Sequence, residues 1–135
     1  MIIFLLTNCQ EKDNFIISKN DINIIKKEAM KACVYKNEFD KLFAAWKKDW
    51  QTNSKTIYSS NTNDAKTLET YYPLLNKGDT IIPLLMEKLL DKDNFFAVVL
   101  FEDIQKTSSL RINYKLGEQD KVIIIIKHWI RDRGD

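Results

Sequence analysis

Apolar side chains recur every three or four positions along much of this chain, which is the spacing that lines one face of an α-helix. The clearest run lies in residues 39–50, and its apolar members are Phe39, Leu42, Phe43, Trp46 and Trp50. The charged residues of the same run lie mostly off that stripe. The pattern predicts an amphipathic helix, capped by Asn37, whose tryptophans pack in the core. A ligand-binding aromatic pair is the alternative for Trp46 and Trp50.

A second amphipathic pattern begins at about residue 18. Ser18 or Asn20 is a typical N-cap residue, and the lysines that follow lie largely opposite the apolar residues. Those apolar residues are Ile22, Ile25, Ala29, Ala32 and Cys33. The spacing predicts a helix in which Cys33 is a small buried residue and not a nucleophile.

The polar stretch 53–64 is rich in Asn, Ser and Thr, which predicts a loop. We expect Tyr58, its only large aromatic residue, to pin the loop onto the body, and a mobile lid is the alternative. Residues 65–76 then predict a helix in which Pro73 either causes a kink or lies in the first turn of a new segment. We expect Gly78 to end this segment with a positive φ.

The most apolar stretch, residues 80–105, predicts a helical hairpin. Asp79 or Thr80 is expected to cap its first helix, and Pro83 falls in the first turn, where a missing N–H costs little. After a short polar connection, residues 95–104 predict a buried helix packed antiparallel to the first. A strand is the alternative for this segment, because two of its residues are β-branched valines.

The last apolar run lies in residues 121–133. Five consecutive β-branched residues at 122–126 have the propensity of a buried strand, but the run continues without a break into a basic end that suits a helix C-terminus. A helix is therefore predicted, and a strand at 121–130 stays the alternative. The whole pattern predicts an all-α, single-domain bundle of about six helices over residues 18–135, preceded by a distinct segment and tether at 1–17.

Composition narrows the classes of function. The 135 residues are 44% hydrophobic and 30% charged, and the formal net charge is only +2. Acidic and basic residues are interleaved, so we expect no nucleic-acid partner. The three glycines and two prolines exclude a glycine-rich phosphate loop and disfavour an all-β fold. Two cysteines and one histidine lack the spacing of metal ligands, and we predict no metal site and no cofactor.

The N-terminal residues carry the strongest hint about location. Residues 2–6 are apolar, Cys9 follows, and residues 10–14 are polar. This order resembles the end of a bacterial lipoprotein signal peptide, in which the Cys receives a lipid and becomes the new N-terminus. The resemblance implies a lipid on Cys9 that holds the protein in the cell envelope. A basic n-region is missing and Asn8 replaces the usual small residue, so the alternative is a core or strand segment of a cytoplasmic protein.

Part of the hairpin resembles one HEAT repeat. Pro83 is followed by two leucines, the turn carries aspartates at 91 and 93, and an apolar helix comes next. No second copy is detectable, which excludes a repeat array. Residues 39–105 contain a helix of the form Phe39…Trp46, a Ser59-Ser60 link, Tyr71 with Leu74-Leu75, and Gly78 ahead of Ile82-Pro83-Leu84-Leu85. This order also resembles a family of small, uncharacterised bacterial proteins, although the family's His-Pro before Tyr71 is absent here. The resemblance implies a fold and a Trp-containing last helix, here with Trp129, and it implies no reaction.

His128 is the only imidazole and therefore the only candidate for a catalytic base of that type. A hydrolase would need a serine near it, and none of the serines lies in a nucleophile-elbow pattern. The candidates for that serine are Ser59, Ser60, Ser108 and Ser109. We therefore predict no catalytic residue.

The last helix carries the most contact-like group of side chains, because Arg and Trp commonly anchor interfaces. The group consists of His128, Trp129, Arg131 and Arg133, and a helix end packed on the core is the alternative. The sequence as a whole favours a non-catalytic interaction module, held in the cell envelope as a lipoprotein, that binds another protein. A cytosolic immunity or antitoxin-like protein that binds one partner is the first alternative, and a hydrolase that uses His128 is the second.

Overall fold

The computed structural model describes residues 16–105 and 117–133. In these ranges the chain forms α-helices and short 3-10 helices and contains no strand. The α-helices are α2 (Lys19–Lys31), α3 (Lys36–Thr52), α4 (Tyr72–Leu75), α5 (Ile82–Lys88), α6 (Val98–Gln105) and α7 (Glu118–Arg133). The 3-10 helices are η1 (Cys33–Tyr35), η2 (Thr62–Thr67), η3 (Glu69–Tyr71), η4 (Gly78–Ile81) and η5 (Lys92–Ala97). The predicted all-α class is confirmed for this part of the chain. Cys9, Ser108 and Ser109 lie outside the described residues.

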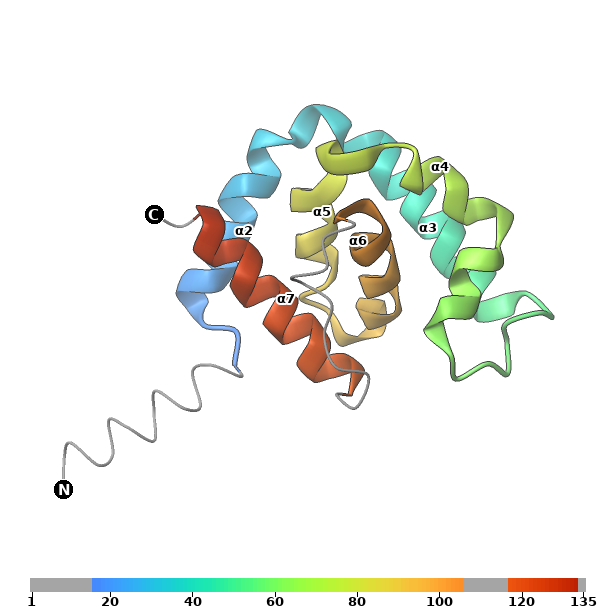
Figure 1. Cartoon of the computed structure of the whole chain (residues 1–135). Helices are drawn as coiled ribbons and strands as arrows, with labels where there is room; N and C mark the ends of the chain where they lie inside the picture. Colours follow the sequence, from blue (N-terminus) through green and yellow to red (C-terminus); the bar gives the residue numbers. More distant parts are fainter. Residues whose placement is uncertain (1–15, 106–116, 134–135) are drawn as a thin grey trace, which may run out of the picture.

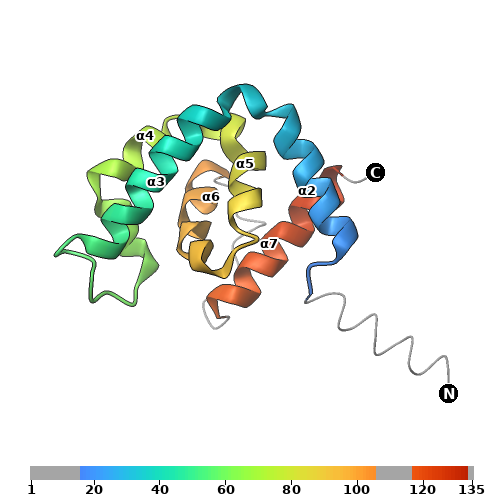
Figure 2. The ribbon, with the colours of Figure 1, turned by 180° about the vertical axis from the view of Figure 1, so that it is seen from behind.

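The two long N-terminal helices form an arch around the most apolar helices (Figure 1). α2 and α3 meet at the top of the arch, and α5 and α6 lie inside it (Figures 1 and 2). α2 packs against α5 and α7, whereas α3 packs against η3 and α4. α7 closes the open side of the arch and also packs against η5. The two segments predicted as helix or strand, 95–104 and 121–130, are helical in the structure.

Aromatic side chains fill the core beneath α3. Trp46 has no exposed surface, and its ring centroid lies 4.8 Å from that of Phe96 and 5.2 Å from that of Tyr71. Its indole N–H donates to the backbone oxygen of Ala65 at 2.9 Å, so the polar edge of the ring is satisfied. Trp50 is partly buried and stacks on Phe96 with 5.9 Å between centroids. The core-packing role predicted for both tryptophans is confirmed.

The N-cap of α2 is Ser18, one of the two candidates that the sequence predicts. The Ser18 hydroxyl accepts from the backbone N–H of Asp21 at 3.1 Å, and the Asp21 carboxylate accepts from the backbone N–H of Ser18 at 3.0 Å. This reciprocal pair is a capping box. The predicted cap at Asn37 is wrong, because α3 begins at Lys36 directly from η1 and its cap position, Tyr35, has a helical ψ of −4° and makes no side-chain cap bond.

The turn between α2 and α3 overturns the prediction for Cys33. The side chain is exposed, whereas its neighbour Ala32 is 8% exposed. A 3-10 turn has three residues per turn and not 3.6, so the apolar stripe of α2 does not continue through η1. The prediction for Tyr58 is also wrong, because that ring is 95% exposed. The loop is held instead by Thr56, whose buried hydroxyl donates to the backbone oxygen of Trp50 at 2.9 Å.

The helix predicted at 65–76 is broken into η2, η3 and α4. Leu68 interrupts it with an extended backbone (φ −83°, ψ 144°) and buries its side chain to 2% exposure. Pro73 lies in the first turn of α4, which confirms that the chain restarts there. Gly78 has the expected positive φ, +63°.

The hairpin is present, but its first helix is shorter than predicted. α5 and α6 lie side by side and run in opposite directions (Figures 1 and 2), and the first four residues of α6 are all buried. The predicted cap at Asp79 or Thr80 is wrong, because η4 leads directly into α5 and the cap position, Ile81, makes no side-chain bond. The Thr80 hydroxyl donates backward, to the oxygen of Lys77 at 2.9 Å.

Candidate functional site

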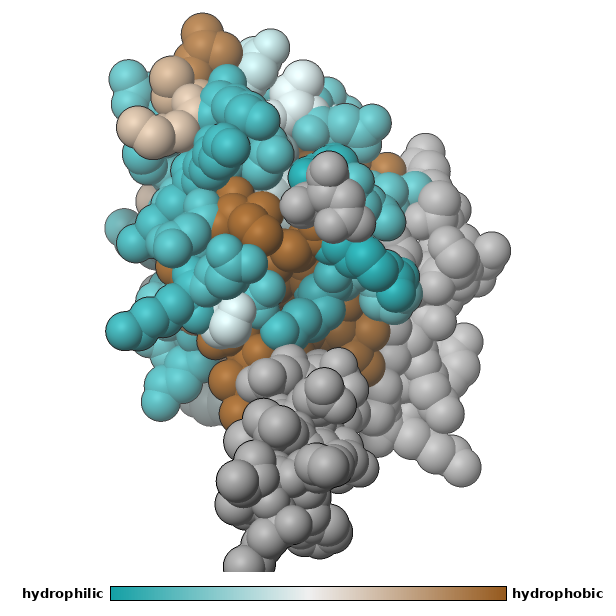
Figure 3. Space-filling model, turned by 90° about the vertical axis from the view of Figure 1, so that its left-hand side faces the viewer, coloured by the Kyte–Doolittle hydropathy of each residue, from teal (hydrophilic) through white to brown (hydrophobic). Residues whose placement is uncertain are grey.

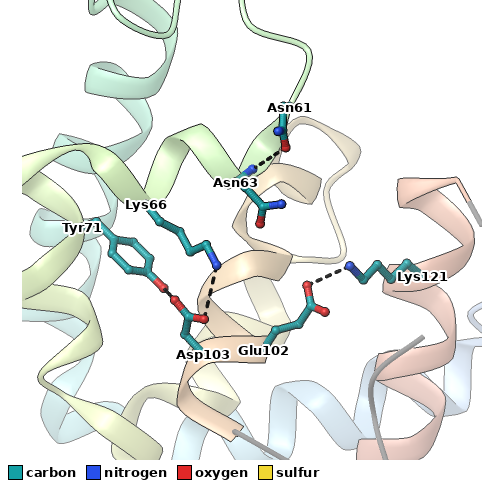
Figure 4. Close-up of polar contacts among 7 residues, drawn as sticks. All are labelled: Asn61, Asn63, Lys66, Tyr71, Glu102, Asp103 and Lys121. Atoms are coloured by element: carbon teal, nitrogen blue, oxygen red, sulfur yellow. Dashed lines mark hydrogen bonds and ion pairs between the residues drawn. The ribbon is translucent and has the colours of Figure 1, made fainter. Parts of the chain in front are cut away.

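A cluster of polar side chains that links separate elements lies at the end of α6 (Figure 4). α6 begins with four buried apolar residues, and its last turn carries two adjacent carboxylates. These side chains face cations and a phenol from η2, η3 and α7. We call this group the α6-end cluster, and its members are Lys66, Tyr71, Glu102, Asp103 and Lys121.

Asp103 is the centre of the cluster. The phenol of Tyr71 donates to its Oδ2 at 2.5 Å, and the Nζ of Lys66 lies 3.5 Å from its Oδ1. Burial of the phenol raises the pKa of Tyr71, and the bond to the Asp103 carboxylate raises that pKa further. Tyr71 therefore stays protonated over the physiological range and acts as a fixed donor to Asp103. The arrangement joins η2 and η3 to the end of α6.

Glu102 makes the opposite connection. Its Oε1 lies 2.9 Å from the Nζ of Lys121 in the first turns of α7, and both side chains are about a quarter exposed (28% and 27%). The two neighbouring carboxylates of α6 therefore point to different sides (Figure 4). Together they connect η2 and η3 to α7 through the end of α6, which supports a role in holding the fold.

An open pocket of about 800 Å³ lies beside this cluster. Its lining consists of Leu75, Asn76, Gly78, Asp79, Glu102, Asp103 and Ile104. Two of its three carboxylates already face cations of the α6-end cluster. Over residues 16–105 and 117–133, no group of three or more His, Cys, Asp or Glu side chains is placed to hold a metal ion.

The other acidic residues near the hairpin lie at its opposite end. Asp91 accepts from the backbone N–H of Asp93 at 2.9 Å and caps η5, as expected for a capping residue. The carboxylates at 91 and 93 therefore do not join Glu102 and Asp103 in one acidic site.

A smaller and more apolar pocket, of about 320 Å³, lies between the start of α2, the turn from α5 to η5, and α7. None of the described residues that line it is charged. The lining residues are Ile17, Ile22, Leu89, Leu90, Phe95, Gln119, Val122, Ile123 and Ile126.

The residues predicted to contact a partner lie along the end of α7. The Nδ1 of His128 lies 2.5 Å from a guanidinium nitrogen of Arg131 and accepts from it. Trp129 is only 5% exposed, and the guanidinium of Arg133 covers its ring at 4.9 Å from the centroid. The Trp129 indole N–H has no partner among the described residues. An approaching molecule would meet the two exposed arginines before the indole, and the contact role of the group stays a prediction.

The hydrolase alternative gains no geometric support. Arg131 is the only polar contact of His128 within the described ranges. Ser59 is one of the candidate nucleophiles. Its hydroxyl donates to the Asp64 carboxylate at 2.6 Å within its own loop. Neither contact brings an imidazole next to a hydroxyl, which nucleophilic catalysis of this type requires.

The structure shows one surface that the sequence patterns did not predict. Three large apolar residues project where α2 meets α3, and their exposed fractions are 76% for Met30, 79% for Val34 and 44% for Tyr35. In Figure 3 brown and tan side chains form a tip at this end of the molecule, among hydrophilic side chains. One sequence feature could have indicated this surface, because the apolar Met30 lies off the buried stripe of α2.

A search of protein-family models, curated proteins and solved structures finds no match to this chain. The resemblance to a HEAT repeat and to a bacterial family therefore stays a prediction. Among the described helices, none combines the length and the apolar character that crossing a bilayer requires.

Proposed function

We propose that this protein is a non-catalytic interaction module that a lipid on Cys9 holds at a membrane of the bacterial cell envelope. The observation that carries the proposal is the order of residues at the N-terminus. An apolar run at 2–6 leads to Cys9, and a polar segment follows at once. A thioether-linked diacylglycerol and an amide-linked chain would supply the two or more acyl groups that stable anchoring requires.

The start of the folded body fits such a tether. Ile17 is the first of the described residues that packs against the core, and the capping box of Ser18 begins α2. Seven residues separate Cys9 from Ile17. A fully extended chain of this length reaches about 25–30 Å, so an anchored Cys9 would keep the body close to the bilayer.

The polar side chains of the described residues favour binding over chemistry. Hydrogen bonds and ion pairs at Asp103, Glu102 and Asp21 join separate elements of the fold. His128 contacts an arginine of its own helix. These arrangements support a protein whose role depends on its surface.

The anchor is tested by metabolic labelling with an alkyne fatty acid in the native bacterium, with the protein expressed from its own gene. We expect label on the wild-type protein and none on Cys9→Ser, together with a shift of that variant out of the membrane fraction. Cys33→Ser is the matched control, because Cys33 is exposed and should not affect labelling.

An unlabelled wild-type protein found in the soluble fraction would contradict the anchor. That result would favour the cytosolic alternative, an immunity or antitoxin-like protein. Purification of the tagged protein from the same cells would then show one stoichiometric protein partner.

A further inference from the structure

The junction between α2 and α3 forms an apolar tip on a convex part of the molecule. We define the tip as Met30, Val34 and Tyr35, which are 76%, 79% and 44% exposed. α2 ends at Lys31 and η1 turns the chain into α3, so these residues lie at the top of the arch in Figure 1. Single exposed apolar residues are ordinary, but three within six residues form a patch of the kind that marks a binding surface.

The acidic residues around the tip are neutralised by cations of the fold. Glu28 lies 3.4 Å from the Nζ of Lys31. Glu38 lies 2.6 Å from the Nζ of Lys77. Asp40 is shared between α3 and α5, because it faces two lysines at 2.6 and 3.3 Å.

The lysines on the outer side of the same helices do not neutralise carboxylates of the described residues. Lys26, Lys27 and Lys41 are exposed, and none of them takes part in an ion pair among the described residues. Lys26 precedes Met30 by four positions and Lys27 precedes it by three, so both lie beside Met30 on the helix surface. The tip is therefore an apolar projection with exposed positive charge at its base.

We propose that this tip is a membrane-contact site and that its ligand is the surface of an anionic bilayer. Met30 and Val34 enter the boundary between headgroups and acyl chains, and the Tyr35 ring lies at headgroup level, where amphipathic rings are favoured. Lys26 and Lys27 lie against lipid phosphates. Apolar residues flanked by lysines suit this chemistry.

A bilayer fits the tip better than a protein partner does. Lysine is depleted in protein–protein interfaces, because its charge is strongly hydrated, whereas each lysine near an anionic membrane contributes to binding. The tip projects, which suits insertion into a soft surface. The proposal does not depend on a lipid at Cys9, and the two contacts would act together, since stable attachment commonly takes two signals.

The test uses the full chain with Cys9→Ser, so that no acyl group contributes to binding. Co-sedimentation is measured with vesicles of 30% phosphatidylglycerol in phosphatidylcholine and with vesicles of phosphatidylcholine alone. We expect binding to the anionic vesicles only, and binding should weaken as salt rises, because exposed charges are screened.

Two pairs of substitutions locate the contact. Lys26→Gln with Lys27→Gln should weaken binding about 25-fold, since each lysine near an anionic surface contributes about fivefold. Met30→Gln with Val34→Gln should weaken binding at least about tenfold, by removing the inserted apolar groups. The control is Lys55→Gln with Tyr58→Gln, because both residues are exposed on a different loop, and it should change binding less than about twofold.

Circular dichroism of each variant must match the parent chain, so that a loss of binding is not a loss of fold. The proposal is overturned if the Cys9→Ser chain fails to bind anionic vesicles, or if the control pair weakens binding as much as the tip pairs do. It is also overturned if the tip variants bind vesicles normally but lose a protein partner captured by crosslinking at the tip. Failure of fatty-acid labelling at Cys9 would leave this result unchanged, so the two proposals fail separately.

Discussion

The α6-end cluster and the apolar tip place charge in opposite ways. At the end of α6 each carboxylate faces a cation or a phenol from another element, with Asp103 between Tyr71 and Lys66. At the tip the carboxylates are satisfied, while Lys26 and Lys27 face solvent beside exposed apolar groups. In the α6-end cluster the charged groups pair with one another and hold elements together. At the tip the lysine charges are available to a ligand.

This difference separates residues that should affect stability from residues that should affect binding. A partly buried hydrogen bond to a charged group contributes about 1.5–3 kcal/mol, because removing one partner leaves the other unsatisfied. Solvated surface lysines contribute within about 0.5 kcal/mol. The comparison therefore predicts large stability losses at the cluster and in the core beneath α3, and nearly none at the tip.

The largest loss is expected for Trp46→Ala, which removes a fully buried side chain of α3 from the core. We expect the free energy of unfolding in urea to fall by about 3–5 kcal/mol, because a cavity replaces the indole and the Ala65 oxygen loses its donor. A loss below about 1 kcal/mol would mean that Trp46 does not lie in the core.

Tyr71→Phe tests the α6-end cluster with little change in shape. Removal of the hydroxyl takes the donor from Asp103, and we expect a loss of about 1.5–3 kcal/mol in urea denaturation. Tyr72→Phe is the matched control on the next residue, because that ring is 54% exposed. Equal losses for the two substitutions would show that the hydrogen bond from Tyr71 to Asp103 does not stabilise the fold.

The Asp21–Lys127 pair gives a pH-dependent prediction. Burial of Asp21 opposes ionisation, but the bonds from Lys127 and Ser18 outweigh it and lower the pKa of Asp21 below 3.8. A lowered carboxyl pKa stabilises the folded state fully above the unfolded pKa, and this contribution is lost as pH falls through the folded pKa. Asp21→Asn should therefore cost about 1–2 kcal/mol at pH 7 and progressively less below about pH 4.

Thermal unfolding of the Asn variant between pH 2 and pH 7 measures this difference. A stability gap to wild type that stays constant below pH 4 would contradict the assignment.

The smallest effect on stability is expected for Lys26→Gln with Lys27→Gln. Both side chains are exposed and lie outside the ion pairs of the described residues, so urea denaturation should show a change within about 0.5 kcal/mol. A loss above about 1.5 kcal/mol would show that these lysines hold the fold, and it would end the contrast with the α6-end cluster.

Local periodicity predicted the parts of the fold that depend on neighbours in sequence. The apolar stripe of α3 follows from spacing, and the residue type at Ser18 predicts an N-cap. The last helix follows from the unbroken length of its run, because spacing alone leaves a strand open there. The prediction that Cys33 is buried is wrong because the 3-10 turn η1 interrupts the helical spacing there. The prediction that Tyr58 holds the loop is wrong because the hydroxyl of Thr56 makes that contact instead. Neither feature leaves a periodic signal.

The α6-end cluster was beyond the reach of sequence patterns for a different reason. Tyr71 lies 32 positions from Asp103, and Lys66 lies 37 positions from it. Their meeting depends on how η2 and η3 fold over α6. The Cys9 motif, in contrast, is a property of sequence alone and lies outside the described residues.

The most direct test of the membrane-contact tip uses Cys33, which becomes the only thiol of the chain when Cys9 is replaced by Ser. Cys33 is exposed within the turn that forms the tip, so an environment-sensitive fluorophore attached there reports on the tip itself. Addition of vesicles with 30% phosphatidylglycerol should shift its emission to the blue and expose it to quenching by spin-labelled acyl chains. The same fluorophore on Tyr58→Cys, in a chain with Cys33→Ser, should show neither change. Emission from Cys33 that stays unshifted while the protein sediments with the vesicles would contradict the tip as the site of contact.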